Sequence, residues 1–228
     1  MRFAIKAPAA PTVEVANTDE RFPVHRIYCV GRNYADHVRE MGTDPARDPP
    51  VFFSKPPDAV VANGAAVPYP PRTSNLHHEI ELVVAIRLAG RDIPLDRALD
   101  HVFGYAVGND LTRRDLQAAA KSSGAPWDVA KGFDHSAPVT AIRRADEVGH
   151  LTGGAIWLEV NGEPRQRADL SEMIWSVPEI VAEASTYFEL QPGDLIFTGT
   201  PAGVGPVVPG DSIVGGIDGL DTLRTTIV

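Results

Sequence analysis

Three carboxylate side chains at the ends of apolar segments could hold a divalent metal ion. Glu79 and Glu81 stand two apart in "HHEIEL", where an apolar run begins, and Asp110 follows the apolar stretch "GYAVGN". Residues two apart on a strand face the same side of the sheet. Because ionised acids at the edge of a core are costly unless paired or bound to metal, this set invites a hard cation. Carboxylate ligands favour Mg²⁺ or Mn²⁺ over Zn²⁺. Salt bridges from both glutamates to nearby arginines are the alternative interpretation.

A histidine and a glutamate three residues apart could form a base and the carboxylate that orients it. They are His37 and Glu40 in the stretch "GRNYADHVREMG", which follows an apolar run. Tyr34, Val38 and Met41 recur at spacings of four and three, and this pattern predicts one short helix. On such a helix, residues 37 and 40 share a face. A solvated helical face is the alternative interpretation of the pair.

Other residues add to this set. Arg32 lies just before the His–Glu pair, and Lys131 lies within "WDVAKGFD". The loop "GTPAGVGP" offers backbone N–H groups, but it lacks the Gly-Lys-Ser/Thr ending of a phosphate loop and by itself is typical of a tight turn. For His77 and His78 we expect structural roles rather than metal ligation. A His–Glu pair, three carboxylates and a lysine at strand or helix ends together indicate metal-assisted, base-catalysed chemistry.

Composition narrows the class of protein. The chain has 228 residues, of which 43% are hydrophobic and 22% charged, as expected for one globular enzyme domain. Its net charge of -9 argues against nucleic-acid binding, which needs a basic surface, and leaves an anionic small substrate open if cations gather in one cleft. No run reaches about 18 apolar residues, and the first ten residues contain no secretory apolar stretch, so we expect a cytoplasmic protein that does not enter membranes. Cys29, the one cysteine, lies in an apolar run and is expected in the core.

Strand signals outnumber helix signals, and the two do not alternate regularly. The fold class is therefore predicted to be α+β and mostly β, rather than a doubly wound parallel sheet. Residues 1–23 should form a leading strand or two, and 80–90 a buried strand. The alternation before Asn161-Gly162 is the clearest hairpin signal, with a type I′ turn.

The expected helices are few and short. Residues 94–110 read as a short helix running into a strand, and 112–123 as a helix that stops at Gly124. Residues 171–190 are expected to be helical with an interruption at Pro178. Between the short helix after Gly31 and the strand at 80, dense proline and glycine predict loops and short strands, with a proline-rich loop over 44–57.

The motifs resemble those of the fumarylacetoacetate hydrolase family, in the small-enzyme branch that acts on acylpyruvates. The matching pieces are "VGRNYADHVREMG", "FFSKP", "NLHHEIEL", "GYAVGNDLTRRDLQ", "PWDVAKGFD", "VNGEPRQ" and "GDLIFTGTPAGVGP". They run in family order from about residue 27 to the end of the chain. The resemblance implies a single catalytic domain over residues 1–228 that resembles the family's C-terminal domain, a mixed β roll with few short helices, and a homodimer. Residues 1–26 form a leading segment without a carried-over motif.

The same resemblance implies roles for individual side chains. It implies that Glu79, Glu81 and Asp110 are ligands of Mg²⁺ or Mn²⁺. It implies a base dyad of His37 and Glu40 on a lid helix, and a catalytic lysine at Lys131. Arg113, Gln117 and Thr200 match substrate-contacting positions, and we add the basic Arg32 as a fourth substrate contact.

The implied function is metal-dependent hydrolysis of a C–C bond in an acylpyruvate. Fumarylpyruvate, cleaved to fumarate and pyruvate, is the leading substrate. His37 would activate the attacking water, while Lys131 and Gln117 would stabilise the oxyanion. Oxaloacetate decarboxylation and isomerisation of 2-hydroxyhepta-2,4-diene-1,7-dioate are alternatives on the same site. A non-catalytic protein that binds a metal or a dicarboxylate is the alternative from another class.

Overall fold

A mixed eight-stranded sheet forms the centre of the molecule in the computed structural model. The structure describes residues 3–42 and 48–228. Its strands run in the order β4-β3-β15-β8-β9-β11-β5, with β12 paired to β9. The β3–β15 and β5–β11 pairs are parallel, and the other neighbouring pairs are antiparallel. The strands are β3 (Arg26–Gly31), β4 (Val51–Lys55), β5 (Val60–Ala62), β8 (Ile80–Ile86), β9 (Val102–Asn109), β11 (Ala137–Val139), β12 (Arg143–Arg144) and β15 (Asp194–Phe197).

A second, five-stranded sheet has the order β14-β13-β17-β18-β6. Its strands are β6 (Ala66–Val67), β13 (Ala155–Val160), β14 (Glu163–Asp169), β17 (Ser212–Ile217) and β18 (Leu223–Ile227). The hairpin that joins β13 to β14 turns at Asn161 and Gly162, whose φ angles are 54° and 79°. Two successive positive φ values are those of a type I′ turn, so this sequence prediction is confirmed.

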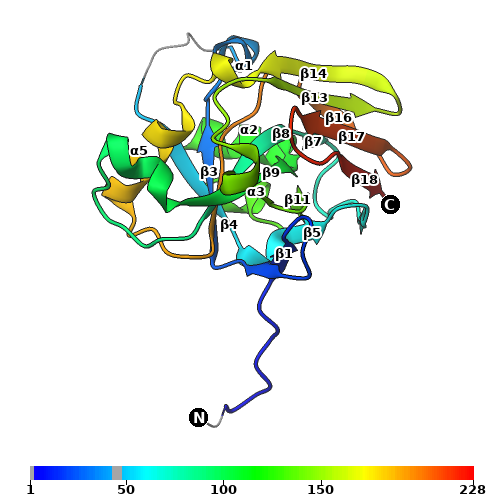
Figure 1. The fold of residues 1–228 in the computed structure, drawn as a ribbon. Helices are drawn as coiled ribbons and strands as arrows, with labels where there is room; N and C mark the ends of the chain where they lie inside the picture. The colour runs from blue at the N-terminus through cyan, green and yellow to red at the C-terminus, as the bar shows by residue number, and fades with distance from the viewer. Residues whose placement is uncertain (1–2, 43–47) are drawn as a thin grey trace.

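Two small sheets complete the strands. The predicted leading strands are confirmed as the pair β1 (Thr12–Glu14) and β2 (Arg21–Pro23). Residues 3–11 extend away from the body (Figure 1). A three-stranded sheet joins β10 (Thr112–Arg113), β7 (Leu76–His78) and β16 (Gly205–Val207).

The helices are short, as expected for a mostly β fold. They are α1 (Ala35–Glu40), α2 (Arg114–Ser123), α3 (Asp128–Lys131), α4 (Ala145–Val148) and α5 (Val177–Tyr187), with 3₁₀ turns η1 (Pro57–Ala59), η2 (Leu95–His101) and η3 (Leu170–Glu172). Gly124 ends α2 with a φ of 67°, and its N–H bonds to the carbonyl of Ala120, which confirms the predicted cap.

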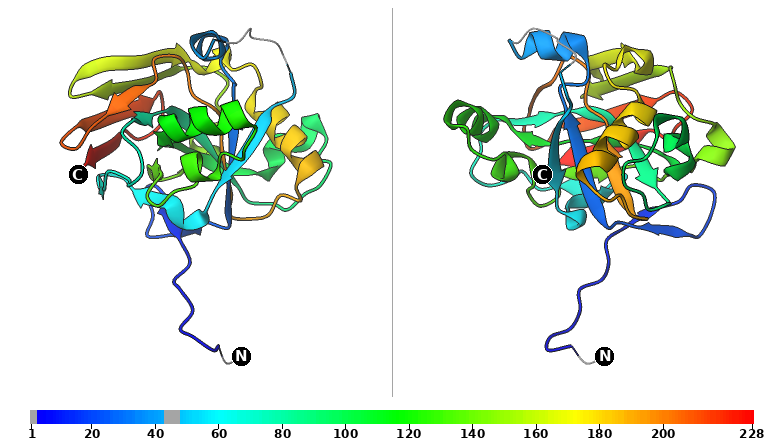
Figure 2. Two further views of the ribbon diagram at one scale, coloured as in Figure 1. Left: turned by 180° about the vertical axis from the view of Figure 1, so that it is seen from behind. Right: turned by 90° about the vertical axis from the view of Figure 1, so that its left-hand side faces the viewer.

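Both faces of the large sheet are buried against apolar side chains. On one face, Leu82, Val84 and Tyr105 pack with residues of the five-stranded sheet and with α5, which lies beside β3 (Figure 2). On the other face, Val83 and Cys29 pack with residues from β1, β2 and β11. Cys29 has no exposed surface, so its predicted place in the core is confirmed. The mostly β architecture agrees with the predicted fold class.

Four expectations need correction. Pro178 does not interrupt a helix but lies in the first turn of α5, where a missing N–H costs nothing, and the segment before it is the 3₁₀ turn η3. The stretch 44–57 is not all loop, because Val51–Lys55 pairs with β3 as strand β4; residues 43–47 lie outside the described residues. The strand expected over 80–90 ends at Ile86, and the expected helix before β9 is the 3₁₀ turn η2.

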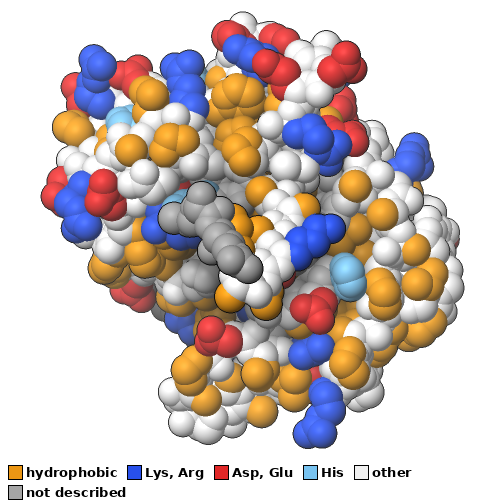
Figure 3. Space-filling view, turned by 90° about the horizontal axis from the view of Figure 1, so that it is seen from below, with side chains coloured by type: hydrophobic (Ala, Val, Ile, Leu, Met, Phe, Trp, Pro, Cys, Tyr) orange, Lys and Arg blue, Asp and Glu red, His pale blue; other side chains and the backbone are white. Residues whose placement is uncertain are grey.

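Two further observations concern the helices and the surface. Within the described part of the chain, no helix is long and apolar enough to span a membrane. On the face shown in Figure 3, basic and acidic side chains are interspersed rather than gathered by sign.

Candidate active site

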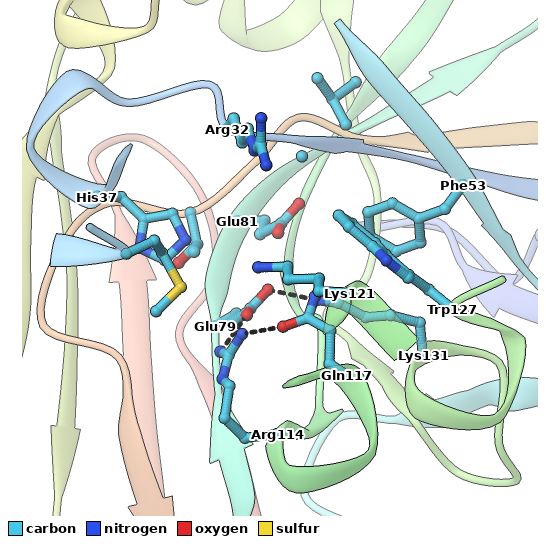
Figure 4. Close-up of a pocket in the computed structure, with 14 residues that line it drawn as sticks. Arg32, His37, Phe53, Glu79, Glu81, Arg114, Gln117, Lys121, Trp127 and Lys131 are labelled. Carbon is cyan, nitrogen blue, oxygen red and sulfur yellow. Dashed lines mark hydrogen bonds and ion pairs between the residues drawn. The ribbon is translucent and has the colours of Figure 1, made fainter. Parts of the chain in front are cut away.

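A pocket opens where the chain leaves β3, beside the start of β8 and the helices α2 and α3 (Figure 4). Its lining is rich in charged side chains, although the whole chain is acidic. The residues that line it are Val30, Gly31, Arg32, His37, Met41, Phe53, Glu79, Glu81, Arg114, Gln117, Lys121, Trp127, Lys131 and Thr200.

The three predicted carboxylates do meet in space. One oxygen from each of Glu79, Glu81 and Asp110 lies within 4.8 Å of the others, and all three residues are buried. The register of β8 against β9 explains the meeting, because the N–H of Asp110 donates to the carbonyl of Glu79 across the sheet at 2.8 Å. The side chains of Glu79 and Glu81 both reach the pocket, as period-two alternation requires. The strand pairing therefore assembles three hard oxygen donors at one point.

The surroundings shift the pKa values of the two glutamates in opposite directions. Burial, followed by the nearby Asp110 and Glu79, raises the pKa of Glu81 well above its usual range, although the Gly199 N–H donates to its Oε2 at 2.8 Å. Burial also raises the pKa of Glu79, but Lys131 and Arg114 outweigh it and the pKa lies below the usual range. Like-charged carboxylates in a buried site are stabilised by a shared cation. The donor set therefore fits Mg²⁺ or Mn²⁺.

Two buried lysines lie against the same carboxylates. Lys131 Nζ is 2.6 Å from Glu79 Oε2 and 2.6 Å from Asp110 Oδ2. Lys55 Nζ forms an ion pair with the other oxygen of Asp110, at 2.8 Å. Burial lowers the pKa of Lys131, but the charges of Asp110 and Glu79 raise it further, and the net pKa is above its usual value. Lys131 is therefore an ammonium group that donates hydrogen bonds, and not a base.

Arginine pairing is realised for one of the two glutamates. Arg114 Nη2 forms an ion pair with Glu79 Oε1, as the alternative interpretation of the sequence allowed. Glu81 has no such partner among the residues the structure describes. The glutamates thus differ in their surroundings although they stand two residues apart.

His37 and Glu40 form a hydrogen-bonded pair on α1. His37 Nδ1 lies 3.2 Å from Glu40 Oε2, and the His37 ring lines the pocket. With Nδ1 engaged by Glu40, Nε2 is the nitrogen available to the cavity. Burial lowers the pKa of His37 below its usual value, although Glu79 and Glu40 oppose that shift. The imidazole is therefore neutral at neutral pH and can accept a proton.

The glycine-rich loop after β15 binds two of these carboxylates through its backbone. Gly199 donates to Glu81, and the N–H of Gly203 lies 3.1 and 3.2 Å from the two carboxylate oxygens of Glu40. The φ angle of Gly203 is +95°, and a Cβ there would lie 2.0 Å from the carbonyl oxygen of Arg165. Only glycine fits that position. The loop is therefore more than the tight turn its sequence suggested, since its donors hold the protein's own acids.

Gln117 and Thr200, two of the predicted substrate contacts, line the pocket with fixed polar atoms. Gln117 is buried, and its Oε1 accepts a hydrogen bond from Arg114 Nη1 at 2.6 Å. Thr200 Oγ1 accepts one from Gln166 Nε2 at 2.7 Å. Gln166 also accepts from the Ile80 N–H at 3.1 Å, so its amide orientation is determined by its neighbours.

Of the two arginines predicted to contact the substrate, Arg32 lines the pocket and Arg113 does not. Arg32 lines the pocket with a left-handed φ of 63°. Arg113 does not line it: its guanidinium lies over the Phe133 ring at 4.5 Å and donates to the carbonyl of Val129, beside a separate hollow. Arg114 reaches the pocket in its place, because the chain turns from β10 into α2 between these neighbours.

Several residues that line the pocket or contact its lining and the carboxylate cluster escaped the sequence reasoning. Lys55, Arg114 and Gln166 lie within "FFSKP", "TRRDLQ" and "VNGEPRQ", stretches singled out as motifs without roles for these positions. Trp127 lies within "PWDVAKGFD", likewise without a role for this position, and Lys121 carried no signal of its own. Of the two histidines before the glutamates, His78 Nδ1 bonds to Gln166 and His77 Nε2 to Asn75, each at 2.9 Å.

Comparison with known proteins finds similar enzymes over nearly the whole chain. The family described as fumarylacetoacetate (FAA) hydrolase C-terminal matches residues 26–228. A fumarylpyruvate hydrolase from Ralstonia sp is 47% identical over 176 residues, which cover 77% of this chain and 91% of that protein. The crystal structure of fumarylpyruvate hydrolase from Pseudomonas aeruginosa, in complex with Mn²⁺ and pyruvate, is 52% identical with a TM-score of 0.98, and the match covers 100% and 99% of the two chains.

Other similar proteins are named for different reactions. A mitochondrial oxaloacetate tautomerase from Mus musculus is 46% identical over 198 residues, covering 87% of this chain and 89% of that protein. A mitochondrial oxaloacetate decarboxylase from Dictyostelium discoideum is 41% identical, covering 86% and 90%. The structure of 2-hydroxyhepta-2,4-diene-1,7-dioate isomerase from Mycobacterium marinum is 36% identical with a TM-score of 0.79, covering 92% and 81%.

Proposed function

The chain belongs to the fumarylacetoacetate hydrolase family, and we propose that it hydrolyses the C–C bond of an acylpyruvate, namely fumarylpyruvate, to fumarate and pyruvate. The observation that carries this proposal is the position of His37, hydrogen-bonded to Glu40, on the wall of the pocket that is also lined by Glu79 and Glu81 of the three-carboxylate cluster. A base beside a cation site is what hydrolytic cleavage of a diketone needs. Similarity to two fumarylpyruvate hydrolases supports the choice of acyl group.

Glu79, Glu81 and Asp110 would hold Mg²⁺ or Mn²⁺. An ion bound there would act as a Lewis acid that polarises the keto oxygens and stabilises negative charge on the departing pyruvate part. Lys131, which lies between Glu79 and Asp110, forms an ion pair with each of them and so holds both carboxylates in place.

His37 would act as the general base. Its Nδ1–H donates to Glu40, and its Nε2 takes a proton from water, whose oxygen then bonds to the acyl carbon. The bond between that carbon and the neighbouring methylene carbon of the pyruvate part breaks, and the electron pair leaves with the methylene carbon. The imidazolium of His37 returns the proton there, which yields pyruvate. Gly203 keeps the Glu40 carboxylate in place throughout.

Three donors would stabilise the oxyanion and anchor the substrate. Lys131 has three ammonium protons, two of which bond to Glu79 and Asp110, so one is left for substrate. The Oε1 of Gln117 accepts from Arg114, and its amide N–H groups donate to no partner within residues 3–42 and 48–228, so they can donate to substrate. Thr200 Oγ1 accepts from Gln166, and its own O–H donates to no partner in the described residues, so it can donate to substrate. Preorganised donors of this kind are the usual source of oxyanion stabilisation.

Oxaloacetate is the second candidate substrate, and the identity to an oxaloacetate tautomerase and a decarboxylase favours it. Tautomerisation needs only a proton acceptor and decarboxylation needs no attacking water, so both are chemically open to the same pocket. Hydrolysis in ¹⁸O-labelled water would place label in the fumarate carboxylate, whereas decarboxylation would release CO₂. Isomerisation of 2-hydroxyhepta-2,4-diene-1,7-dioate would leave the carbon skeleton intact, so product analysis separates all three.

A panel assay tests the proposal directly. We expect loss of ultraviolet absorbance from fumarylpyruvate with Mg²⁺ or Mn²⁺, and none in excess chelator. No turnover of any acylpyruvate or oxaloacetate with either metal would leave a non-catalytic metal or dicarboxylate binder as the surviving interpretation. The homodimer and the cytoplasmic location remain predictions, which sedimentation analysis and cell fractionation would test.

A further inference from the structure

The pocket contains more positive charge than its own acids neutralise. Four basic side chains line it, and two of them, Arg114 and Lys131, form ion pairs with the carboxylate cluster. The other two, Arg32 and Lys121, form no ion pair with a carboxylate in residues 3–42 and 48–228. In a chain of net charge -9, two unpaired cations at one pocket point to an anionic ligand.

Helix α2 directs Lys121 toward the pocket. Lys121 follows Gln117 by four residues, so the two side chains lie on the same face of the helix, and both line the cavity. The Lys121 ammonium lies 5.3 Å from the centre of the Trp127 ring, a cation–π contact that limits where the side chain can go. In Figure 4 Lys121 extends into the pocket from α2.

Arg32 approaches the same pocket from β3. Its φ of 63° lies in the left-handed region, which a residue with a Cβ adopts at a cost, and such strain is concentrated at functional sites. Burial, Arg114 and Arg32 together lower the pKa of Lys121 below its usual value, in that order. The two cations are therefore close enough to repel each other, and an anion between them would relieve that repulsion.

We propose that Lys121, together with Arg32, binds a distal carboxylate on the acyl group, so that the pocket selects acylpyruvates whose acyl chain ends in a carboxylate. This inference rests on the proposed function, because it assumes that the pyruvate part lies at Glu79, Glu81 and Asp110. The acyl part must then extend past His37, away from the cluster. Phe53 and Trp127 line the pocket with flat apolar surfaces that fit a conjugated double bond.

The first test compares two substrates that differ at the distal end. Fumarylpyruvate ends in a carboxylate, whereas acetylpyruvate ends in a methyl group. For Lys121→Met, kcat/KM on fumarylpyruvate should fall about 10- to 100-fold more than on acetylpyruvate, the range for losing a hydrogen bond to a charged group. Lys121→Arg should recover most of this difference because it restores the charge.

Arg91→Met is the matched control. Arg91 is exposed and does not line the pocket, and its loss changes the net charge by the same amount. This variant should leave the ratio of the two kcat/KM values at its parent value. Equal losses on both substrates in Lys121→Met, or a ratio that shifts as much in Arg91→Met, would overturn the assignment of Lys121.

A binding measurement separates this proposal from the hydrolytic one. The probes are 2-oxoheptanedioate and 2-oxoheptanoate, which have the same chain length and differ only in the distal carboxylate. Titration calorimetry with the Mn²⁺-loaded protein should give tighter binding of the diacid, and Lys121→Met should abolish most of that preference. If the parent cleaves no acylpyruvate but prefers the diacid, the hydrolytic proposal fails and the distal site stands. If it cleaves fumarylpyruvate but binds both probes equally, the distal site fails alone.

Discussion

The imidazole Nδ1 of His37 lies 3.2 Å from the carboxylate of Glu40, and it is this contact that leaves Nε2 for the pocket. The two side chains differ in exposure, since 9% of the His37 side chain and 33% of the Glu40 side chain is accessible. The buried imidazole therefore faces the cavity, while the carboxylate that orients it is held from outside by Gly203. A division of this kind suits a base and its orienting acid.

Removal of the base should slow the chemical step without preventing binding. For His37→Ala, we expect kcat for fumarylpyruvate to fall about 10²- to 10⁴-fold, the range for loss of a general base. Metal content and oxalate affinity should survive, because His37 is not a proposed ligand. Asp36→Asn, on the same helix but exposed, is the control and should change little. Near-parent hydrolysis by His37→Ala would show that the buried imidazole is not the general base.

The pH profile should report the state of His37. The neutral form is the active base, and burial lowers its pKa below 6.5, so kcat/KM should be level at neutral pH and fall only in the acid range below that value. Glu40 raises the pKa of His37, so Glu40→Gln should move the acid limb to still lower pH while reducing the plateau rate by less than His37→Ala does. An acid limb that moves to higher pH in Glu40→Gln would contradict this arrangement.

Metal dependence follows from the carboxylate cluster. Excess chelator should abolish activity, and added Mg²⁺ or Mn²⁺ should restore it, because the leaving pyruvate part has no other strong Lewis acid. Glu81→Gln keeps the shape of the side chain but removes its charge, so the purified variant should lose bound metal and rate together. Retention of both metal and rate by Glu81→Gln, or full activity in chelator, would contradict the assignment of the three carboxylates as metal ligands.

Replacement of Gln166 should lower the free energy of unfolding. It is buried and bonds to Thr200, to the carbonyl of Pro201, to the Ile80 N–H and to His78. Gln166→Leu leaves buried polar groups without partners, each at about 1–3 kcal/mol, so we expect about 2–4 kcal/mol of lost stability in urea titrations. Gln191→Leu, at a less buried position, is the control. A stability change below about 0.5 kcal/mol in Gln166→Leu would mean that these groups find other partners.

The helix α1 is expected to act as a lid. It is only six residues long, and short helices have little intrinsic stability, so its order should depend on contacts with a bound ligand. Residues 33–42 should gain protection from hydrogen exchange when oxalate and metal are added, while β8 should be protected in both states. Equal protection of 33–42 with and without oxalate would argue for a permanently closed helix.

Local patterns were sufficient for several parts of this structure. The alternation of side chains along a strand places Glu79 and Glu81 on one face, and the helical spacing pairs His37 with Glu40. The Asn161-Gly162 turn and the Gly124 cap also follow from the conformational freedom of single residues. Each of these features depends on neighbours within about four positions, and this is why the sequence alone determined them.

Other features depend on contacts between residues far apart in the chain. Pairing of β8 with β9 brings Asp110 to Glu79, and packing of α3 brings Lys131 between them. The hydrogen bond from the Gly203 N–H to the Glu40 carboxylate joins residues 163 positions apart, and no local pattern predicts it. Whether Arg113 or Arg114 enters the pocket is decided by the point at which β10 ends and α2 begins. Boundaries of that kind are set by packing against other elements rather than by local propensity, so only the tertiary structure could decide them.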